Sequence, residues 1–119
     1  YVPVDSLHVN GELTLGENIA DLAGLTMAYR AYHLSLHGRK APVIDGFTGD
    51  QRFFLGYGQI WRTKFRDEFL KRIIVSDPHS PSEYRCNGVL INMPEFDAAF
   101  NVEKGDGMYK APEDQIKIW

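Results

Sequence analysis

Residues 14–38 read TLGENIADLAGLTMAYRAYHLSLHG, and this stretch decides the class of the fold. It opens on Thr14 and Glu17 in the T-x-x-E spacing of a capping box, which is typical of a helix start. It closes on Gly38, a residue type that often ends a helix. Apolar residues recur through it at helical spacing, at Leu25, Tyr29, Tyr32 and Leu36. We therefore expect one long helix over Leu15–His37.

Proline, glycine and capping residues divide the rest of the chain into shorter helices. Thr48 and Gln51 resemble a second capping box, and Ser80-Pro81 followed by Glu83 combines a Ser N-cap with Pro at the first helical position. The expected helices run from Thr48 to about Thr63, over Arg66–Ile74, from Ser80 to about Ile91, and from Pro94 to Phe100. Alternating, strand-like patterns are weak throughout. The predicted fold is mainly α, with about five helices, irregular loops and little or no strand, in one domain over residues 1–119.

Composition excludes several classes of function. The 119 residues carry 13 basic and 16 acidic side chains, a net charge of −3, which disfavours nucleic-acid binding because that needs a basic face. No apolar run approaches the ~20 residues of a membrane span. The single cysteine, Cys86, excludes an internal disulfide and a zinc site built from cysteine pairs, and its own role stays open.

Two carboxylates share one face of the long helix. Glu17 and Asp21 are four residues apart, and the same face continues through Gly24 and Ala28. Small side chains let another backbone come close, so this face is suited to delivering a carboxylate to a metal held by a neighbouring helix. The alternative is that Glu17 only closes a capping box and Asp21 is solvated.

A second candidate group lies in the segment Asp77-Pro78-His79-Ser80-Pro81. His79 directly precedes an expected helix N-terminus, whose positive end suits a developing oxyanion, and Arg85 follows six residues later. The alternative is an exposed loop histidine and an ordinary surface arginine. His33 and His37 have no clear third ligand and are interpreted as cations at a helix C-terminus. Ile60 and Trp61 lie on an aromatic helix face, which by itself indicates core.

Taken together, these stretches resemble one family. VNGELTLGENIAD at residues 9–21 is similar to the neprilysin-like zinc endopeptidases, whose signature includes ENxxD with small flanking residues. The D-x-H-S-P segment at residues 77–81, followed by Tyr84-Arg85, resembles a later segment of that family. Gln59-Ile60-Trp61, Arg66, Glu95-Phe96 and the terminal Trp119 match in the same order. The resemblance covers nearly the whole chain and corresponds to the C-terminal part of a larger catalytic domain of the gluzincin type.

The resemblance implies a role for each matching residue. Glu17 would be the third zinc ligand, and Asp21 would fix the tautomer of a zinc-binding histidine. His79 would stabilise the transition state, and Arg85 would bind a substrate carbonyl and help to hold the carboxylates near the zinc. Two further residues, Ile60 and Trp61, would line the pocket for the apolar substrate residue after the scissile bond. The implied reaction is zinc-dependent hydrolysis of short peptides on the amino side of apolar residues.

The departures from the family are equally informative. The chain contains no HExxH, so the general base and two zinc ligands must come from a partner, the remainder of the catalytic domain. We expect the chain alone to be inactive and not to bind zinc tightly, and its small-residue face could drive self-association. Ile116 stands where secreted animal members carry a disulfide cysteine, so the chain resembles a bacterial member. We expect an extracytoplasmic location, in the periplasm or at the cell surface, with the cytoplasm as the alternative. The alternative function is a non-catalytic helical binding or interaction module.

Overall fold

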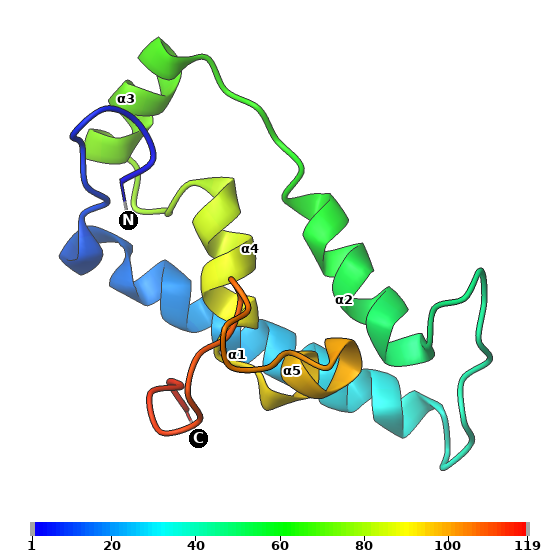
Figure 1. Cartoon of the computed structure of the whole chain (residues 1–119). Helices are drawn as coiled ribbons and strands as arrows, with labels where there is room; N and C mark the ends of the chain where they lie inside the picture. Colours follow the sequence, from blue (N-terminus) through cyan, green and yellow to red (C-terminus); the bar gives the residue numbers. More distant parts are fainter. Residues whose placement is uncertain (1, 119) are drawn as a thin grey trace.

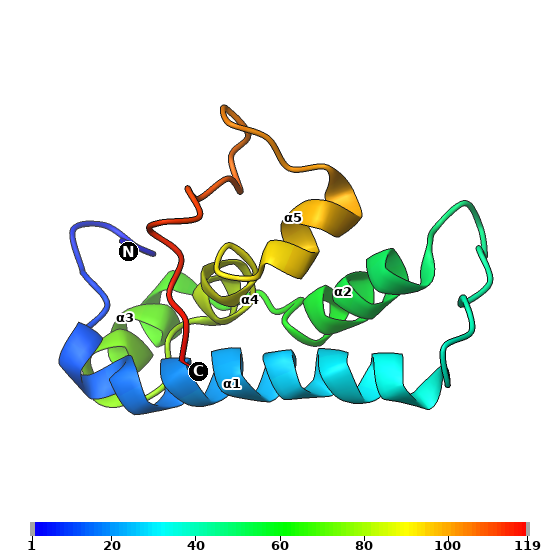
Figure 2. The ribbon, with the colours of Figure 1, turned by 90° about the horizontal axis from the view of Figure 1, so that it is seen from below.

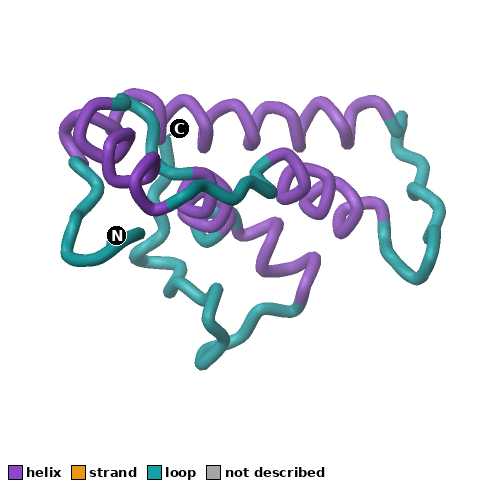
Figure 3. Tube along the Cα trace, turned by 90° about the horizontal axis from the view of Figure 1, so that it is seen from above, coloured by secondary structure: helices purple, strands orange, loops and turns teal. Residues whose placement is uncertain are grey.

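The computed structural model describes residues 2–118 and contains five helices (Figure 1). They are α1 Gly11–Ser35, α2 Gly49–Ile60, α3 Asp67–Ser76, α4 Ser82–Leu90 and α5 Pro94–Phe100. Among the described residues, β-structure is limited to two isolated bridges, Val4 with Leu7 and Ile44 with Phe47. The mainly α fold class is confirmed, as is the irregular tail that follows α5 (Figure 3). Trp119 lies outside the described residues.

The long helix α1 forms the base on which the other helices lie. It has 25 residues, and Figure 2 shows α2, α3, α4 and α5 on one side of it. The opposite side is bare, so the small residues Gly16, Ala20, Gly24 and Ala28 are exposed. The face that the sequence suggested for close packing is therefore divided: Glu17 and Asp21 contact the chain around α4, whereas Gly24 and Ala28 on the same face are exposed.

Packing of α1, α2 and α4 produces the core. Apolar side chains from these helices, with Met93 just before α5, form one buried cluster: Leu22, Leu25, Phe54, Val89, Leu90 and Met93. Close contacts pair α1 with α4 and α2 with α5. Leu22 of α1 and Val89 of α4 belong to this cluster. Asp21 is next to Leu22, and Arg85 lies one turn before Val89, so the packing of α1 on α4 brings these two polar side chains face to face.

Two predicted helix starts are wrong, and hydrogen bonding explains both. Helix α1 begins at Gly11, because the side chain of Asn10 accepts from the backbone of Glu12 and Leu13 at 3.1 Å each. Thr14 is instead buried inside the first turns, where its hydroxyl donates to the Asn10 carbonyl. Glu17 therefore lies inside the helix and does not take part in capping it.

Helix α4 starts at Ser82, one residue later than predicted from a Ser80 N-cap with Pro81 as the first helical residue. Pro81 occupies its N-cap position, and no side chain caps the helix. The hydroxyl of Ser80 donates to the side chain of Asn18 on α1, at 2.9 Å, so a tertiary contact takes the group that could have capped the helix. The capping box of Thr48 and Gln51, by contrast, is confirmed at the start of α2.

The other helix boundaries differ from the predictions only at the ends. Helix α2 stops at Ile60 rather than Thr63, α3 spans Asp67–Ser76, and α5 spans Pro94–Phe100 as predicted. No described helix is both long enough and apolar enough to cross a membrane.

Candidate active site

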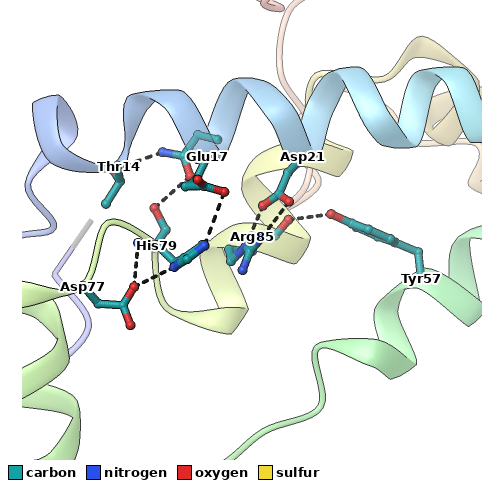
Figure 4. Close-up of polar contacts among 9 residues, drawn as sticks. Thr14, Glu17, Asp21, Tyr57, Asp77, His79 and Arg85 are labelled. Carbon is teal, nitrogen blue, oxygen red and sulfur yellow. Dashed lines mark hydrogen bonds and ion pairs between the residues drawn. The ribbon is translucent and has the colours of Figure 1, made fainter.

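The candidate site lies where α1 passes the loop before α4 (Figure 4). One helical turn separates Glu17 from Asp21 on α1, and the facing chain contributes His79 and Arg85. Figure 4 shows each carboxylate of α1 directed at one of these two groups. The structure therefore brings together four residues that the sequence placed in two separate segments, more than 50 positions apart.

Glu17 meets His79 in an open contact. The Nε2 atom of His79 lies 3.3 Å from Oε2 of Glu17, and the two side chains are 42% and 44% exposed. This distance is longer than the ~2.7–2.9 Å of a strong charge-assisted hydrogen bond. Both partners consequently keep free surface for a third group.

Asp77 fixes the orientation of His79. Its Oδ1 atom lies 2.7 Å from Nδ1 of the histidine ring and accepts the backbone N–H of His79 at 2.8 Å. The two hydrogen bonds from His79 lower the pKa of the Asp77 carboxyl. With Nδ1 directed at Asp77, the ring is held with Nε2 toward α1.

Asp21 and Arg85 form a closed pair. Arg85 donates to both carboxylate oxygens of Asp21, from Nε and from Nη2, at 2.7 Å each. The side chains are only 13% and 20% exposed, and the pairing with Asp21 raises the pKa of Arg85. A bidentate pair of this kind fixes both distance and angle. The alternative that Asp21 is solvated is wrong.

Tyr57, in α2, and Trp61, directly after α2, contact Arg85 from the side opposite Asp21. The guanidinium carbon lies 4.3 Å from the centre of the Trp61 ring, a cation–π contact. The hydroxyl of Tyr57 donates to the Arg85 carbonyl at 3.0 Å, and burial raises the pKa of Tyr57 to about 12. Arg85 of α4 thus contacts both α1 and α2.

The two members of the proposed substrate pocket behave differently. Trp61 is partly buried against Arg85 and Tyr57, whereas Ile60 is 69% exposed. The interpretation of Ile60 as core is therefore wrong. Its apolar side chain is exposed to solvent at the same end of α2 that carries Trp61.

Sequence reasoning missed three residues of the site. Asp77 was quoted only as part of a motif, although it orients His79. Asn18 bridges the two segments, because it donates to Thr14 at 3.2 Å and accepts from Ser80 at 2.9 Å. Tyr57, which donates to the Arg85 carbonyl, was not singled out at all. The signals were present, since Asn18 and Asp77 both stand inside the motifs that the sequence singled out.

His33 lies away from this group and contacts α2 instead. Its Nε2 atom is 3.0 Å from Oδ1 of Asp50, and the same carboxylate accepts the hydroxyl of Tyr29. The described residues contain no cluster of three or more His, Cys, Asp or Glu side chains able to hold a metal ion. Glu17 could therefore serve as one ligand of a metal whose other ligands come from outside this set.

Comparison with known proteins identifies the family of the chain. Residues 1–116 match Peptidase family M13. The chain belongs to peptidase family M13. Neprilysin-1 of Caenorhabditis elegans is 40% identical to the M13 chain over 118 residues, which is 95% of this chain and 15% of that protein. Human neprilysin is 40% identical over 116 residues, covering 94% of this chain and 15% of its own length.

Solved structures show the same fold. The Mycobacterium tuberculosis zinc metalloprotease Zmp1 in complex with an inhibitor is 50% identical, with a TM-score of 0.94 over 98% of the M13 chain. Zmp1 in its open state is 52% identical, with a TM-score of 0.92 over 95%. In both cases the match covers 18% of the Zmp1 chain. The M13 chain thus spans less than a fifth of the length of these relatives.

Proposed function

We propose that this chain is the C-terminal part of the catalytic domain of a zinc endopeptidase that hydrolyses short peptides on the amino side of apolar residues. The observation that carries the proposal is the convergence of Glu17, His79, Asp21 and Arg85 between α1 and α4. Membership of family M13 and the similarity to a zinc metalloprotease support it. The remainder of the domain, carrying HExxH, would be the obligatory partner.

Glu17 fits the role of one zinc ligand. Its carboxylate is half exposed, unconstrained by capping, and only loosely paired with His79. The two histidines of HExxH would complete the set of protein ligands and leave a position for water. Zinc, when bound, would supply Lewis acidity toward the scissile carbonyl. Asp21 would accept a hydrogen bond from a ligand histidine and so hold its tautomer.

His79 and Arg85 would act on the substrate. With Nδ1 held by Asp77, a ring that also carries a proton on Nε2 would donate it to an oxyanion formed beside the Glu17 carboxylate, which Nε2 reaches at 3.3 Å. Arg85, already held by Asp21 and Trp61, would present its remaining N–H groups to a substrate carbonyl. Ile60 and Trp61 would form the pocket for the apolar residue after the scissile bond.

The relatives support an origin for the protein, and we also propose a location. Identity is 50–52% to the mycobacterial structures and 40% to the animal neprilysins named above, which supports a bacterial protein. We place it outside the cytoplasm, at the cell surface or in the periplasm. Fractionation of cells that express the longer protein, with immunodetection of this segment, would test the assignment.

Two substitutions in the longer protein test the roles. Glu17→Ala should abolish zinc retention, measured as zinc per mole of protein after dialysis. His79→Ala should retain zinc but slow turnover by about 10²–10³-fold, as expected for the loss of one oxyanion donor. His33→Ala is the matched control, because His33 is also an exposed histidine paired with a carboxylate.

Each of these predictions can be contradicted by a specific result. Unchanged turnover of His79→Ala on a peptide with an apolar residue after the cleaved bond would show that its proposed role is wrong. Stoichiometric tight zinc, or peptidase activity, in the isolated 119-residue chain would contradict the need for a partner. We expect neither.

A further inference from the structure

A cluster of unpaired cations begins where the candidate site ends. Residues 62–66 read RTKFR and connect α2 to α3 without helix or strand. They contain Arg62, Lys64 and Arg66 and no acidic residue, in a chain whose net charge is −3. All three side chains are exposed, and none of them forms an ion pair with a described residue. We call residues 62–66 the basic linker.

The start of the basic linker is fixed to the site. It follows directly from Trp61, whose ring contacts the guanidinium of Arg85. The backbone N–H of Arg62 also bonds back to the Gln59 carbonyl at 3.3 Å, which ties the first linker residue to the end of α2. The first cation therefore lies next to the residue proposed to contact the substrate.

The basic linker leaves the site at Trp61 and runs to α3. In Figure 1 it runs from the end of α2 to α3 on the side of α4 away from α1, and Figure 4 shows its ribbon passing on the same side of His79 and Arg85. From Trp61 to Asp67 the chain can reach at most about 20 Å, at roughly 3.3 Å per residue. An extended peptide has the same rise, so at most about six peptide positions could lie beside the linker.

The unpaired cations of the basic linker raise the local electrostatic potential. A row of exposed like charges creates a local positive potential, which attracts a ligand of opposite charge and is weakened by salt. Lys71, on α3 just beyond the linker, is already neutralised by Asp5 at 2.6 Å, whereas the three linker cations keep their charge available. Carboxylates are the groups that such cations recognise in a peptide.

We propose that the basic linker is a substrate-selecting edge, which favours peptides with acidic side chains a few residues after the scissile bond. The direction follows from Trp61, which would line the pocket for the residue directly after that bond, so the inference rests on the proposed function. Positions beyond that pocket would pass along Lys64 and Arg66. The substrate class is thus a short peptide with one apolar residue followed by Asp or Glu.

Charge reversal in the longer protein tests the inference. The measurement is the ratio of kcat/KM for a peptide with two Glu residues at the second to fourth positions after the cleaved bond to that for the same peptide with Gln. We expect wild type to favour the acidic peptide at low salt, and Lys64→Glu with Arg66→Glu to reduce the ratio about 5–10-fold, as for two exposed charge contacts. Raising the salt from 0.02 to about 0.5 M should reduce the wild-type ratio in the same direction.

Controls separate the possible outcomes. Lys104→Glu reverses an exposed cation in the tail and should leave the ratio unchanged. A ratio that is insensitive to salt and to the double reversal overturns the inference, as does an equal loss on both peptides. Failure of the proposed function looks different, because then wild type cleaves neither peptide. A zinc-free binding assay with fluorescently labelled acidic and neutral peptides should show the same preference, and equal affinities would also overturn it.

Discussion

Two acid–base pairs stand one helical turn apart on α1, yet they are built in opposite ways. Asp21 and Arg85 meet through two hydrogen bonds of 2.7 Å and are mostly buried. Glu17 and His79 meet through one contact of 3.3 Å and are almost half exposed. The closed pair keeps only the remaining lone pairs of Asp21 and N–H groups of Arg85 for other partners, whereas both members of the open pair are widely exposed. The closed pair therefore joins α1 to α4, and the open pair leaves room for a third group.

The closed pair has the larger expected effect on stability. Arg85→Ala should lower the free energy of unfolding of the chain by about 2–4 kcal/mol, because it leaves the Asp21 carboxylate buried without its partner. Urea unfolding followed by circular dichroism measures the change. Lys71→Ala is the matched control, since it breaks an exposed ion pair and should cost at most about 1 kcal/mol. Equal losses of unfolding free energy in the two variants would show that the Asp21–Arg85 pair does not hold α1 and α4 together.

Neutralising the two carboxylates should sharpen the contrast. Asp21→Asn loses one charge-assisted acceptor for Arg85 and should cost about 1.5–3 kcal/mol. Glu17→Gln should stay within about 0.5 kcal/mol, since it alters an exposed, loosely paired group. Thermal and urea unfolding of both variants compare them directly. A larger loss for Glu17→Gln than for Asp21→Asn would reverse our assignment of open and closed pairs.

The smallest expected effect is the pH dependence that Asp77 gives to the open pair. Its pKa is lower in the folded chain than the usual ~4, because of the hydrogen bonds from His79. Its stabilising contribution is therefore present above about pH 4 and is lost as the pH falls through the lowered folded pKa. Urea midpoints between pH 6 and pH 2.5 should fall less steeply in Asp77→Asn. Glu113→Gln, an exposed tail carboxylate, should follow wild type; a curve of Asp77→Asn identical to wild type would contradict the orienting hydrogen bonds.

Capping signals show how far local sequence reaches. Thr48 caps α2 as predicted, because both partners of its capping box lie within four residues and need no tertiary contact. Thr14 has the same signature but is buried, and Asn10 caps the helix one turn earlier. Ser80 also has a capping signature, and it bonds to Asn18 from 62 residues away. A short polar side chain has several possible partners, and packing selects among them.

The site shows the same division. The ENxxD and D-x-H-S-P motifs singled out Glu17, Asp21 and His79 through their resemblance to the family, since spacing alone left structural alternatives open. Their pairing was beyond the reach of spacing, because His79 and Glu17 are 62 positions apart and meet only when α1 packs on α4. The orienting role of Asp77 needed the ring position of His79 as well.

The sequence by itself determined the helical class, the approximate helix ranges and the family, and it singled out the residues of the candidate site. These properties depend on periodicity and on residue types within a few positions of one another. Tertiary structure alone decided that Asp21 is sealed by Arg85 while Glu17 stays open. Burial and hydrogen-bond geometry set that difference, and both arise only when helices distant in sequence come within a few ångströms of each other.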